Sequence, residues 1–524
     1  MVHYLPYFSL NLLIPHYYNV MAINIGLKKK KLLLFLVILG VLCSLFYFEW
    51  WFQSGRLGNP LYILIFTVFT FYIITQVYFI WIIYLNARYP KKLKTEKKYN
   101  VDVFLPTYNE PLEIIEKTLR AVVNMNYPHK TYLIDDGNNY LHKMLAERYN
   151  AIYLTRNDKK DYKAGNINNV LKYSKGEIIA IFDIDHIPQV DYLDKVVGYF
   201  DDPTIGAVQV ALDHYNSSES FVAESCCTMS DDFFAATMMG MNELNSAVIF
   251  GSNSIFRREA LISIGGYKPG LAEDLHTSVH LHSKGWKSVY VSEVLAQGLV
   301  PADLAAFSKQ QLKWANGVFE VLFTIFPKLI RSLKVSQIIC YLTRMTYYLA
   351  GPVVFFHLIL TVLALYSRTF NQVFTDYIIH SIPFLLIFFI IQIYVKSYYF
   401  LKGTEKRSHL GGYLLVLGTW PIYTLALLTA LIRIKIPFIS TPKELSQKNS
   451  LLLIIPQLIT VCVLSAGIIF KIINFYNPYS FIIIMFAAIL ILIHFGIFYS
   501  ALEKYSYRVS NRVLVKNLVR RVFF

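Results

Sequence analysis

The chain has 524 residues, of which 55% are hydrophobic and 16% aromatic, and its formal net charge is +16. Such a composition is too apolar for an ordinary soluble protein and indicates several membrane spans. The positive charge does not indicate nucleic-acid binding, because much of it lies beside the predicted spans, where membrane topology and anionic membrane lipid account for it. The five cysteines show no metal-ligand spacing, so we expect neither a zinc site nor a disulfide framework.

Windows of about 20 apolar residues are long enough to cross a bilayer, and six such windows cover residues 32–52, 61–85, 338–366, 377–401, 451–473 and 479–500. Basic residues precede the first window and follow the second, so the positive-inside rule places the domain that follows in the cytoplasm. A seventh stretch, 411–432, is assigned to the membrane interface, because that placement keeps every basic loop on the inner side. We expect a multi-pass protein of the plasma membrane, without a signal peptide and with Met21 as an alternative start.

These features divide the chain into seven parts. They are an N-terminal segment with two spans (1–98), a cytoplasmic α/β domain (99–303), interfacial helices (304–336), two spans (337–402), an interfacial helix with a loop (403–448), two further spans (449–502) and a basic cytoplasmic tail (503–524).

Strands and helices alternate in the first half of the cytoplasmic domain. Strands are predicted at 101–105, 131–134, 151–155 and 177–182, and helices at 112–125 and 163–172. This order indicates a mixed, mostly parallel sheet that binds its ligands at the carboxyl ends of the strands. Polar residues follow three of these strands, namely Asn109 with Glu110, Asp135 with Asp136, and Asp183 with Asp185.

Asp183 and Asp185 follow a hydrophobic run and are two residues apart. On extended backbone, such residues point to the same side, so both carboxylates can reach one centre. A hard divalent cation such as Mg²⁺ binds one or two carboxylates together with phosphate oxygens. The pair therefore indicates a metal–diphosphate site, with a solvated turn as the alternative.

Two later segments carry further candidates, each with a structural alternative. Glu273 and Asp274 form a carboxylate pair ahead of a predicted helix, where they could serve a reaction or simply cap the helix. Trp314 lies among Gln and Lys residues in the segment 308–319. It could stack on a sugar ring or anchor an amphipathic helix at the bilayer surface.

The motifs of the region 98–448 together resemble those of the processive, membrane-embedded family 2 glycosyltransferases, most closely the cellulose synthase catalytic subunits. The matching motifs are PTYNE at 106–110, DDG at 135–137, KAGNIN at 163–168, DID at 183–185, ED at 273–274, HSKGWKS at 282–288 and QQLKW at 310–314. Seven motifs in the family's order are far more specific than any one of them. The resemblance implies a cytoplasmic domain of the GT-A type beside a transmembrane channel that exports the growing chain.

The resemblance also implies an activity, namely inverting transfer of a sugar from a nucleotide sugar, with UDP-glucose expected, to a growing polysaccharide, with Mg²⁺ or Mn²⁺ as cofactor. Asp274 would be the catalytic base with Glu273 beside it, and Asp183 and Asp185 would hold the metal. The implied nucleotide-sugar site consists of Thr107, Asn109, Glu110, Asp135, Asp136, Lys163, Asp183, Gln310, Lys313, Thr441 and Lys443. The implied acceptor site consists of Trp314, Phe250 and Gln311.

The segment PFISTPK at 437–443 resembles the family's gating loop, so Phe438, Thr441 and Lys443 would close over the nucleotide sugar. A lid of this kind excludes water and limits hydrolysis. Other implied partners are membrane lipid and either accessory subunits or further copies of the chain.

Four departures from the family pattern are Ala272 for Thr, Lys313 for Arg, Ser440 for Val and Phe250 for Cys. Lysine keeps the charge of arginine but loses its two-pronged phosphate geometry, and Phe250 leaves the sugar and the linkage open. The alternatives are a polymerase like hyaluronan or chitin synthase, or a non-processive transferase with a lipid-linked acceptor. Outside enzymes, a transport or scaffold protein with a degenerate site is the alternative.

Overall fold

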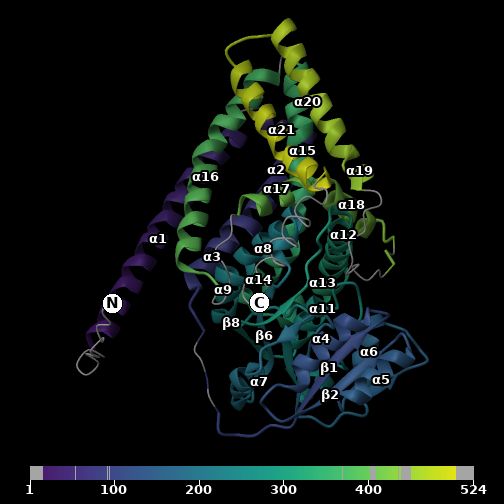
Figure 1. The fold of residues 1–524 in the computed structure, drawn as a ribbon. Helices are drawn as coiled ribbons and strands as arrows, with labels where there is room; N and C mark the ends of the chain where they lie inside the picture. Colours follow the sequence, from purple (N-terminus) through teal and green to yellow (C-terminus); the bar gives the residue numbers. More distant parts are fainter. Residues whose placement is uncertain are drawn as a thin grey trace, which may run out of the picture.

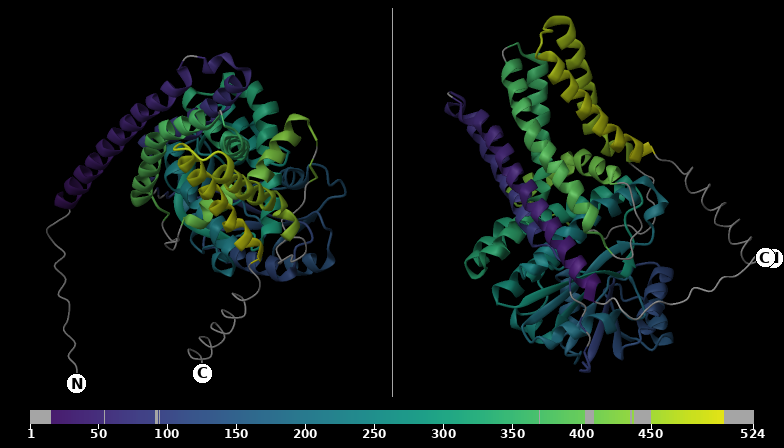
Figure 2. Two further views of the ribbon diagram at one scale, coloured as in Figure 1. Left: turned by 90° about the horizontal axis from the view of Figure 1, so that it is seen from above. Right: turned by 90° about the vertical axis from the view of Figure 1, so that its left-hand side faces the viewer.

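The computed structural model of the chain describes residues 16–53, 55–90, 93, 95–368, 370–401, 409–434, 436–437 and 450–502. It consists of an α/β domain with a group of long apolar helices on one side of it (Figure 1, Figure 2). The predicted gating-loop residues Phe438, Thr441 and Lys443 lie outside the described residues.

Among the described residues, one eight-stranded sheet runs through the α/β domain in the order β3-β2-β1-β4-β7-β6-β8-β5. Its strands are β1 (Val101–Thr107), β2 (His129–Asp135), β3 (Ile152–Thr155), β4 (Ile178–Ile181), β5 (Ile187–Pro188), β6 (Ile205–His214), β7 (Ser254–Arg257) and β8 (Lys287–Gly298). Strands β1 to β4 pair in parallel, whereas β7 is antiparallel to both β4 and β6. The predicted β1–β4 half is therefore confirmed, and the other half makes the sheet mixed.

Alternate residues of the central strands pack into two cores on opposite faces of the sheet. Val103 and Leu105 of β1 belong to one core, while Phe104 belongs to the other. Such burial on both faces requires covering helices and explains why these strands appear in the sequence as continuous hydrophobic runs. The helices of this domain are α4 (Leu112–Val123), α5 (Tyr140–Arg148), α6 (Tyr162–Val170), α7 (Tyr192–Val196), α8 (Phe221–Asp232), α9 (Met238–Glu243), α10 (Arg258–Ser263) and α11 (Glu273–Ser283).

Within the described part of the chain, six helical segments are long and apolar enough to cross a membrane. They are Lys29–Phe52, Tyr62–Asn86, Val335–Tyr366, Phe370–Tyr398, Ile455–Asn474 and Ser480–Ala501. Each overlaps one of the predicted windows. The helices that form this region are α1 (His16–Phe52), α2 (Pro60–Ile73), α3 (Phe79–Asn86), α14 (Val335–Thr346), α15 (Ala350–Tyr366), α16 (Phe370–Tyr398), α19 (Ser450–Leu453), α20 (Ile455–Asn474) and α21 (Ser480–Leu502).

The ambiguous stretch 411–432 folds as two helices, α17 (Leu410–Gly418) and α18 (Trp420–Leu431), which meet at an angle of 46°. A bend of this size is typical of a broken span or a re-entrant segment and does not fit a single straight helix. The placement of this stretch at the membrane interface stays a prediction.

Helix α12 (Leu304–Glu320) connects the two regions, and the short α13 (Phe326–Leu329) follows it. Ala315 and Phe319 of α12 share one hydrophobic core with Ala272 and Leu275 of the α/β domain and with Tyr423 of α18. The QQLKW motif is therefore fixed where the sheet domain meets the apolar helices.

Candidate active site

The three polar clusters predicted from the strand ends do meet at one edge of the sheet. The backbone register pairs Thr107 at the end of β1 with Asp135 at the end of β2. The next backbone N–H, that of Asp136, donates to the Thr107 carbonyl at 3.0 Å. Strand β4 lies on the other side of β1 and leads directly into Asp183.

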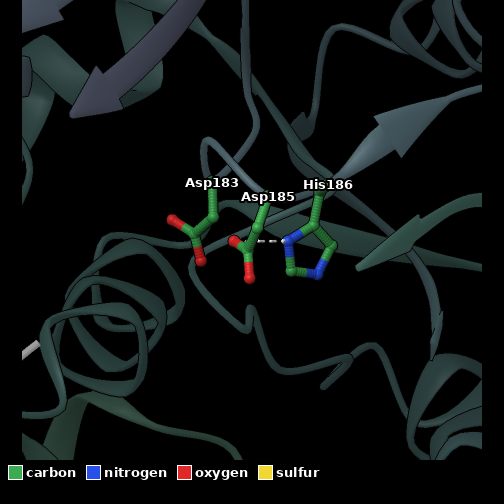
Figure 3. A group of neighbouring side chains, drawn as sticks. All are labelled: Asp183, Asp185 and His186. Atoms are coloured by element: carbon green, nitrogen blue, oxygen red, sulfur yellow. Dashed lines mark ion pairs between the residues drawn. The ribbon is translucent and has the colours of Figure 1, made fainter. Parts of the chain in front are cut away.

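A candidate metal site lies just after β4. Asp183, Asp185 and His186 each offer a ligand atom, and these atoms all lie within 4.8 Å of one another (Figure 3). The Nδ1 atom of His186 is 3.4 Å from an Asp185 oxygen. Within the described part of the chain, neither ring nitrogen of this buried histidine has a hydrogen-bond partner. Two carboxylates and an unbonded imidazole are a donor set that suits a divalent cation.

His186 is not among the residues predicted from the sequence. The sequence nonetheless indicated this histidine, because His186 directly follows the predicted carboxylate pair in the segment DIDH.

Lys163 links this cluster to the second carboxylate pair. Its Nζ atom is 2.5 Å from Asp183 Oδ1 and 3.9 Å from Glu273 Oε1, and it also donates to the Gly251 carbonyl at 2.9 Å. Burial would lower the pKa of the ammonium group, but the charges of Asp183 and Glu273 outweigh burial and raise the pKa above its usual value. Lys163 therefore stays charged among the carboxylates.

Glu273 and Asp274 open helix α11, where the Leu275 N–H donates to Asp274 Oδ1 at 2.7 Å. Burial and the neighbouring Asp274 raise the pKa of Glu273 to about 7. Burial also raises the pKa of Asp274, while the Leu275 N–H and the positive charge of Arg344 act against that rise. A partly buried carboxylate with a raised pKa can accept a proton near neutral pH, which is what general-base chemistry requires.

Arg344 is a second functional candidate that the sequence reasoning missed. It lies on α14, and its guanidinium carbon is 5.7, 5.6 and 5.7 Å from the ring centres of Phe233, Phe250 and Tyr348. Arg344 is the only charged residue in the window 338–366. A lone charge inside an apolar span is itself a sign of function, so this residue could have been singled out.

The predicted nucleotide-side residues divide into two groups. Thr107, Glu110 and Asp136 line a large cavity that opens at the strand ends. The Glu110 carboxylate accepts from the Thr107 hydroxyl at 2.6 Å and from the Tyr108 N–H at 2.5 Å, while both oxygens of Asp136 accept from Arg156 at 2.7 Å. These contacts fix the two acidic side chains at the cavity wall.

Asp135 and Asn109 do not line that cavity. The buried Asp135 carboxylate accepts hydrogen bonds that organise the loop after β2, from Gly137 N–H, Asn139 N–H, the His142 ring and the Tyr153 hydroxyl. Asn109 has a φ of 58°, a conformation that asparagine tolerates in turns. In the structure, both residues shape the loops beside the cavity.

The QQLKW segment presents all of its predicted residues, Gln310, Gln311, Lys313 and Trp314, to the cavity. Trp314 is 39% exposed, so part of its side chain is accessible. Gln311 Oε1 accepts from the Tyr423 hydroxyl at 3.0 Å. The predicted acceptor residue Phe250 also lines the cavity, and its ring centre is 5.3 and 5.0 Å from those of Phe233 and Phe234.

One cavity of about 1520 Å³ is lined by the metal-ligand cluster, Lys163, the Glu273–Asp274 pair, Arg344 and the QQLKW residues. It begins at the strand ends around Asp183, passes Asp274 and Trp314, and continues between the apolar helices as far as Phe389 and Ile493. A space of this shape can hold a charged ligand at the sheet edge and an extended molecule beyond it.

Comparison with known proteins places these features in a family. Residues 178–400 match the family model described as "Glycosyl transferase family group 2". Residues 178–400 thus carry the match to a family 2 glycosyltransferase domain. It is 32% identical over 351 residues to the cellulose synthase 1 catalytic subunit (UDP-forming) of Komagataeibacter xylinus, covering 63% of this chain and 47% of that protein. It is also 32% identical over 346 residues to the cellulose synthase catalytic subunit of Pseudomonas fluorescens, covering 61% of this chain and 46% of that protein.

The chain thus spans about half the length of the curated relatives it matches. Among solved structures, it is similar to the mannosyltransferase PcManGT of Pyrobaculum calidifontis in complex with GDP-Man and Mn²⁺, with 18% identity and a TM-score of 0.45 over 71% of this chain and 99% of that chain. The predicted family resemblance is confirmed. The predicted fold class, a GT-A-type domain with about six apolar helices, is confirmed by the family match, the mixed sheet and the six candidate spans.

Proposed function

We propose that the protein is a membrane-embedded, inverting glycosyltransferase that adds sugars from a nucleotide sugar to a growing polysaccharide and exports the product. One observation carries this proposal. The candidate metal-ligand cluster at Asp183, the ammonium of Lys163 and the partly buried pair Glu273–Asp274 share one cavity that continues between the apolar helices. Identity to cellulose synthase catalytic subunits supports the same activity.

The donor end of the cavity lies at the strand ends. Asp183, Asp185 and His186 would hold Mg²⁺ or Mn²⁺, which would offset the negative charge that develops on the departing diphosphate. Lys163 and Lys313 line the same space and add positive charge toward the diphosphate. UDP-glucose is the proposed donor, since the relatives are described as UDP-forming cellulose synthases and cellulose is a polymer of glucose. Thr441 and Lys443 would complete this end as part of the proposed gating loop.

Asp274 is the proposed base. Its carboxylate takes the proton from an acceptor hydroxyl while that oxygen attacks the anomeric carbon of the donor sugar. The new carbon–oxygen bond forms on the face opposite the diphosphate, the bond to the diphosphate breaks, and the configuration inverts. Glu273 lies beside the base, and its raised pKa leaves it partly protonated near neutral pH, which limits the negative charge of the pair.

The acceptor end begins at Trp314, where a partly exposed ring can stack on the terminal sugar without fixing its hydroxyls. The cavity then continues between spans that carry Tyr47, Phe69, Tyr377 and Phe384 in its wall. We propose that this part conducts the product across the plasma membrane, with the α/β domain in the cytoplasm. The charge distribution beside the first two spans supports that orientation.

The test is a donor panel. Purified protein in lipid vesicles is incubated with Mg²⁺ and a set of UDP- and GDP-sugars, and nucleoside diphosphate release is measured. We expect release from UDP-glucose and a polymer that a β-1,4-glucanase degrades. A polymer degraded only by another linkage-specific hydrolase would change the proposed sugar or linkage, and no release from any donor would refute the function.

A further inference from the structure

The cavity between the apolar helices stops short of their outer ends, by which we mean the ends that lie away from the α/β domain (Figure 1). The last residue that lines it toward that side is Tyr47 in α1, Phe69 in α2, His357 in α15, Tyr377 in α16 and Phe486 in α21. Helix α16 begins at Phe370, so Tyr377 lies about 10 Å inside its outer end at a rise of about 1.5 Å per residue. Within the described part of the chain, the cavity therefore ends about two helical turns before the spans do.

Buried aromatic side chains lie directly beyond this end. The ring centres of Trp50, Trp51 and Phe374 are 5.1, 6.1 and 6.1 Å from the ring centre of Tyr377. These three buried side chains do not line the large cavity but line a separate cavity of about 10 Å³. Tyr377 lines both cavities, so its side chain is part of the partition between them. We call Trp50, Trp51, Phe374 and Tyr377 the outer aromatic layer.

A hydrogen bond to His357 holds the hydroxyl of Tyr377. His357 Nδ1 is 2.8 Å from the Val353 carbonyl, so this nitrogen carries the ring proton and Nε2 accepts from the Tyr377 hydroxyl at 2.8 Å. The ring of Phe69 stacks on the His357 ring, with centres 4.5 Å apart and an angle of 5° between the planes. The net stability of one such hydrogen bond is small, so a sugar hydroxyl that arrives at this point can replace it.

A product that leaves through this cavity has to pass the outer aromatic layer. A path wide enough for a sugar ring also conducts water and small ions, so the path needs to be closed whenever no product fills it. Aromatic rings suit both states, because they exclude water when they pack together and stack on sugar faces when a chain passes. The indole N–H of Trp50 is buried and has no hydrogen-bond partner among the described residues, so it can donate to a passing sugar hydroxyl.

We propose that Tyr377 is the movable part of a gate at the outer end of the cavity. Without product, the hydrogen bond to His357 holds Tyr377 against Trp50 and Phe374, and the path is closed. The growing chain replaces that hydrogen bond, displaces the Tyr377 ring and passes between the aromatic side chains of the layer. The passage of product rests on the proposed function, whereas the seal belongs to the empty protein and is measurable without turnover.

The test of the seal is K⁺ leakage from vesicles. Every protein carries Asp274→Asn, so that no product fills the cavity, and is reconstituted without donor into KCl-loaded phosphatidylcholine–phosphatidylglycerol vesicles. The gate variant is Tyr377→Ala with Trp50→Ala, which removes two rings of the outer aromatic layer. The control is Tyr366→Ala with Phe52→Ala, because these residues lie near the outer ends of α15 and α1, are 40% and 66% exposed and line neither cavity.

We expect the gate variant to release K⁺ at least about tenfold faster than Asp274→Asn alone, and the control to stay within about twofold, because only the gate variant removes a constriction. Release is followed with a K⁺-selective electrode. Equal release from the gate variant and the control would overturn the inference, whether both are tight or both leak.

Photocrosslinking tests the gate without removing a ring. Protein with an intact Asp274 and p-benzoylphenylalanine in place of Tyr377 is irradiated during synthesis from radiolabelled UDP-glucose with Mg²⁺. We expect labelled product on α16, and none when the same photoreactive group replaces Tyr366. Product that forms without labelling α16 would contradict passage at Tyr377. If no product forms, the proposed function fails instead, and the K⁺ leakage alone decides whether the seal exists.

Discussion

Glu273 offers a quantitative prediction, because its pKa in the folded protein is raised from an ordinary value of 4.5 to about 7. At about 1.4 kcal/mol for each pH unit, ionising this side chain in the folded state costs about 3 kcal/mol more than in the unfolded chain. A carboxyl group with a raised pKa contributes stability that is fully present below pH 4.5 and is lost as the pH rises through 7. Glu273→Gln should abolish this pH-dependent loss of stability, since the amide is neutral at every pH.

The assay is thermal unfolding of detergent-solubilised protein between pH 5 and pH 8, in EDTA so that no divalent cation adds charge to the site. We expect the unfolding midpoint of Glu273→Gln, relative to that of wild type, to be a few degrees higher at pH 8 than at pH 5. In a chain of this size, a shift of a few degrees corresponds to about 3 kcal/mol. Glu259→Gln, at an exposed carboxylate of the same domain, serves as the control and should show no such trend. A difference between Glu273→Gln and wild type that does not grow with pH would refute the reasoning.

Three further predictions concern activity, measured as UDP release from UDP-glucose. Lys163→Met removes the ion pair to Asp183. It should lower kcat/KM at least about tenfold, which corresponds to the free energy of a charged hydrogen bond. An unchanged rate would exclude Lys163 from the site. Arg344→Gln removes the charge that lowers the pKa of Asp274, so the acid limb of the pH–rate profile should move to higher pH. Arg344→Lys should return the limb to its wild-type position. A limb that does not move would contradict the electrostatic effect of Arg344 on Asp274. EDTA should abolish turnover, and added Mg²⁺ or Mn²⁺ should restore it. Asp185→Asn should need at least about tenfold more metal for the same rate. Turnover that is independent of metal would rule out a role for the cation.

The sequence was most informative where chemistry and spacing coincide. The carboxylates Asp183, Asp185 and Asp274 were predictable because their motifs follow recognisable strand and helix boundaries, and the structure places all three in one cavity. The six candidate spans were predictable because the hydropathy of a segment depends on its composition alone.

Other features depend on partners that are remote in the sequence. Asp135 has the same motif context as Asp136, yet its carboxylate is occupied by His142 and Tyr153, and no local pattern reveals those hydrogen bonds. The ring contacts of Arg344 come from segments, around Phe233 and Phe250, that only the folded chain brings together. The antiparallel strand β7, inserted between β4 and β6, likewise follows from long-range pairing.

The central claim is that Asp274 performs chemistry on a nucleotide sugar. The most direct measurement is sugar transfer and UDP release by vesicle-reconstituted wild type and Asp274→Asn, with Glu259→Gln as a control for reconstitution. We expect Asp274→Asn to lose at least about a hundredfold in transfer, the contribution of a general base, while still binding the nucleotide sugar. Transfer at the wild-type rate by Asp274→Asn would contradict the account.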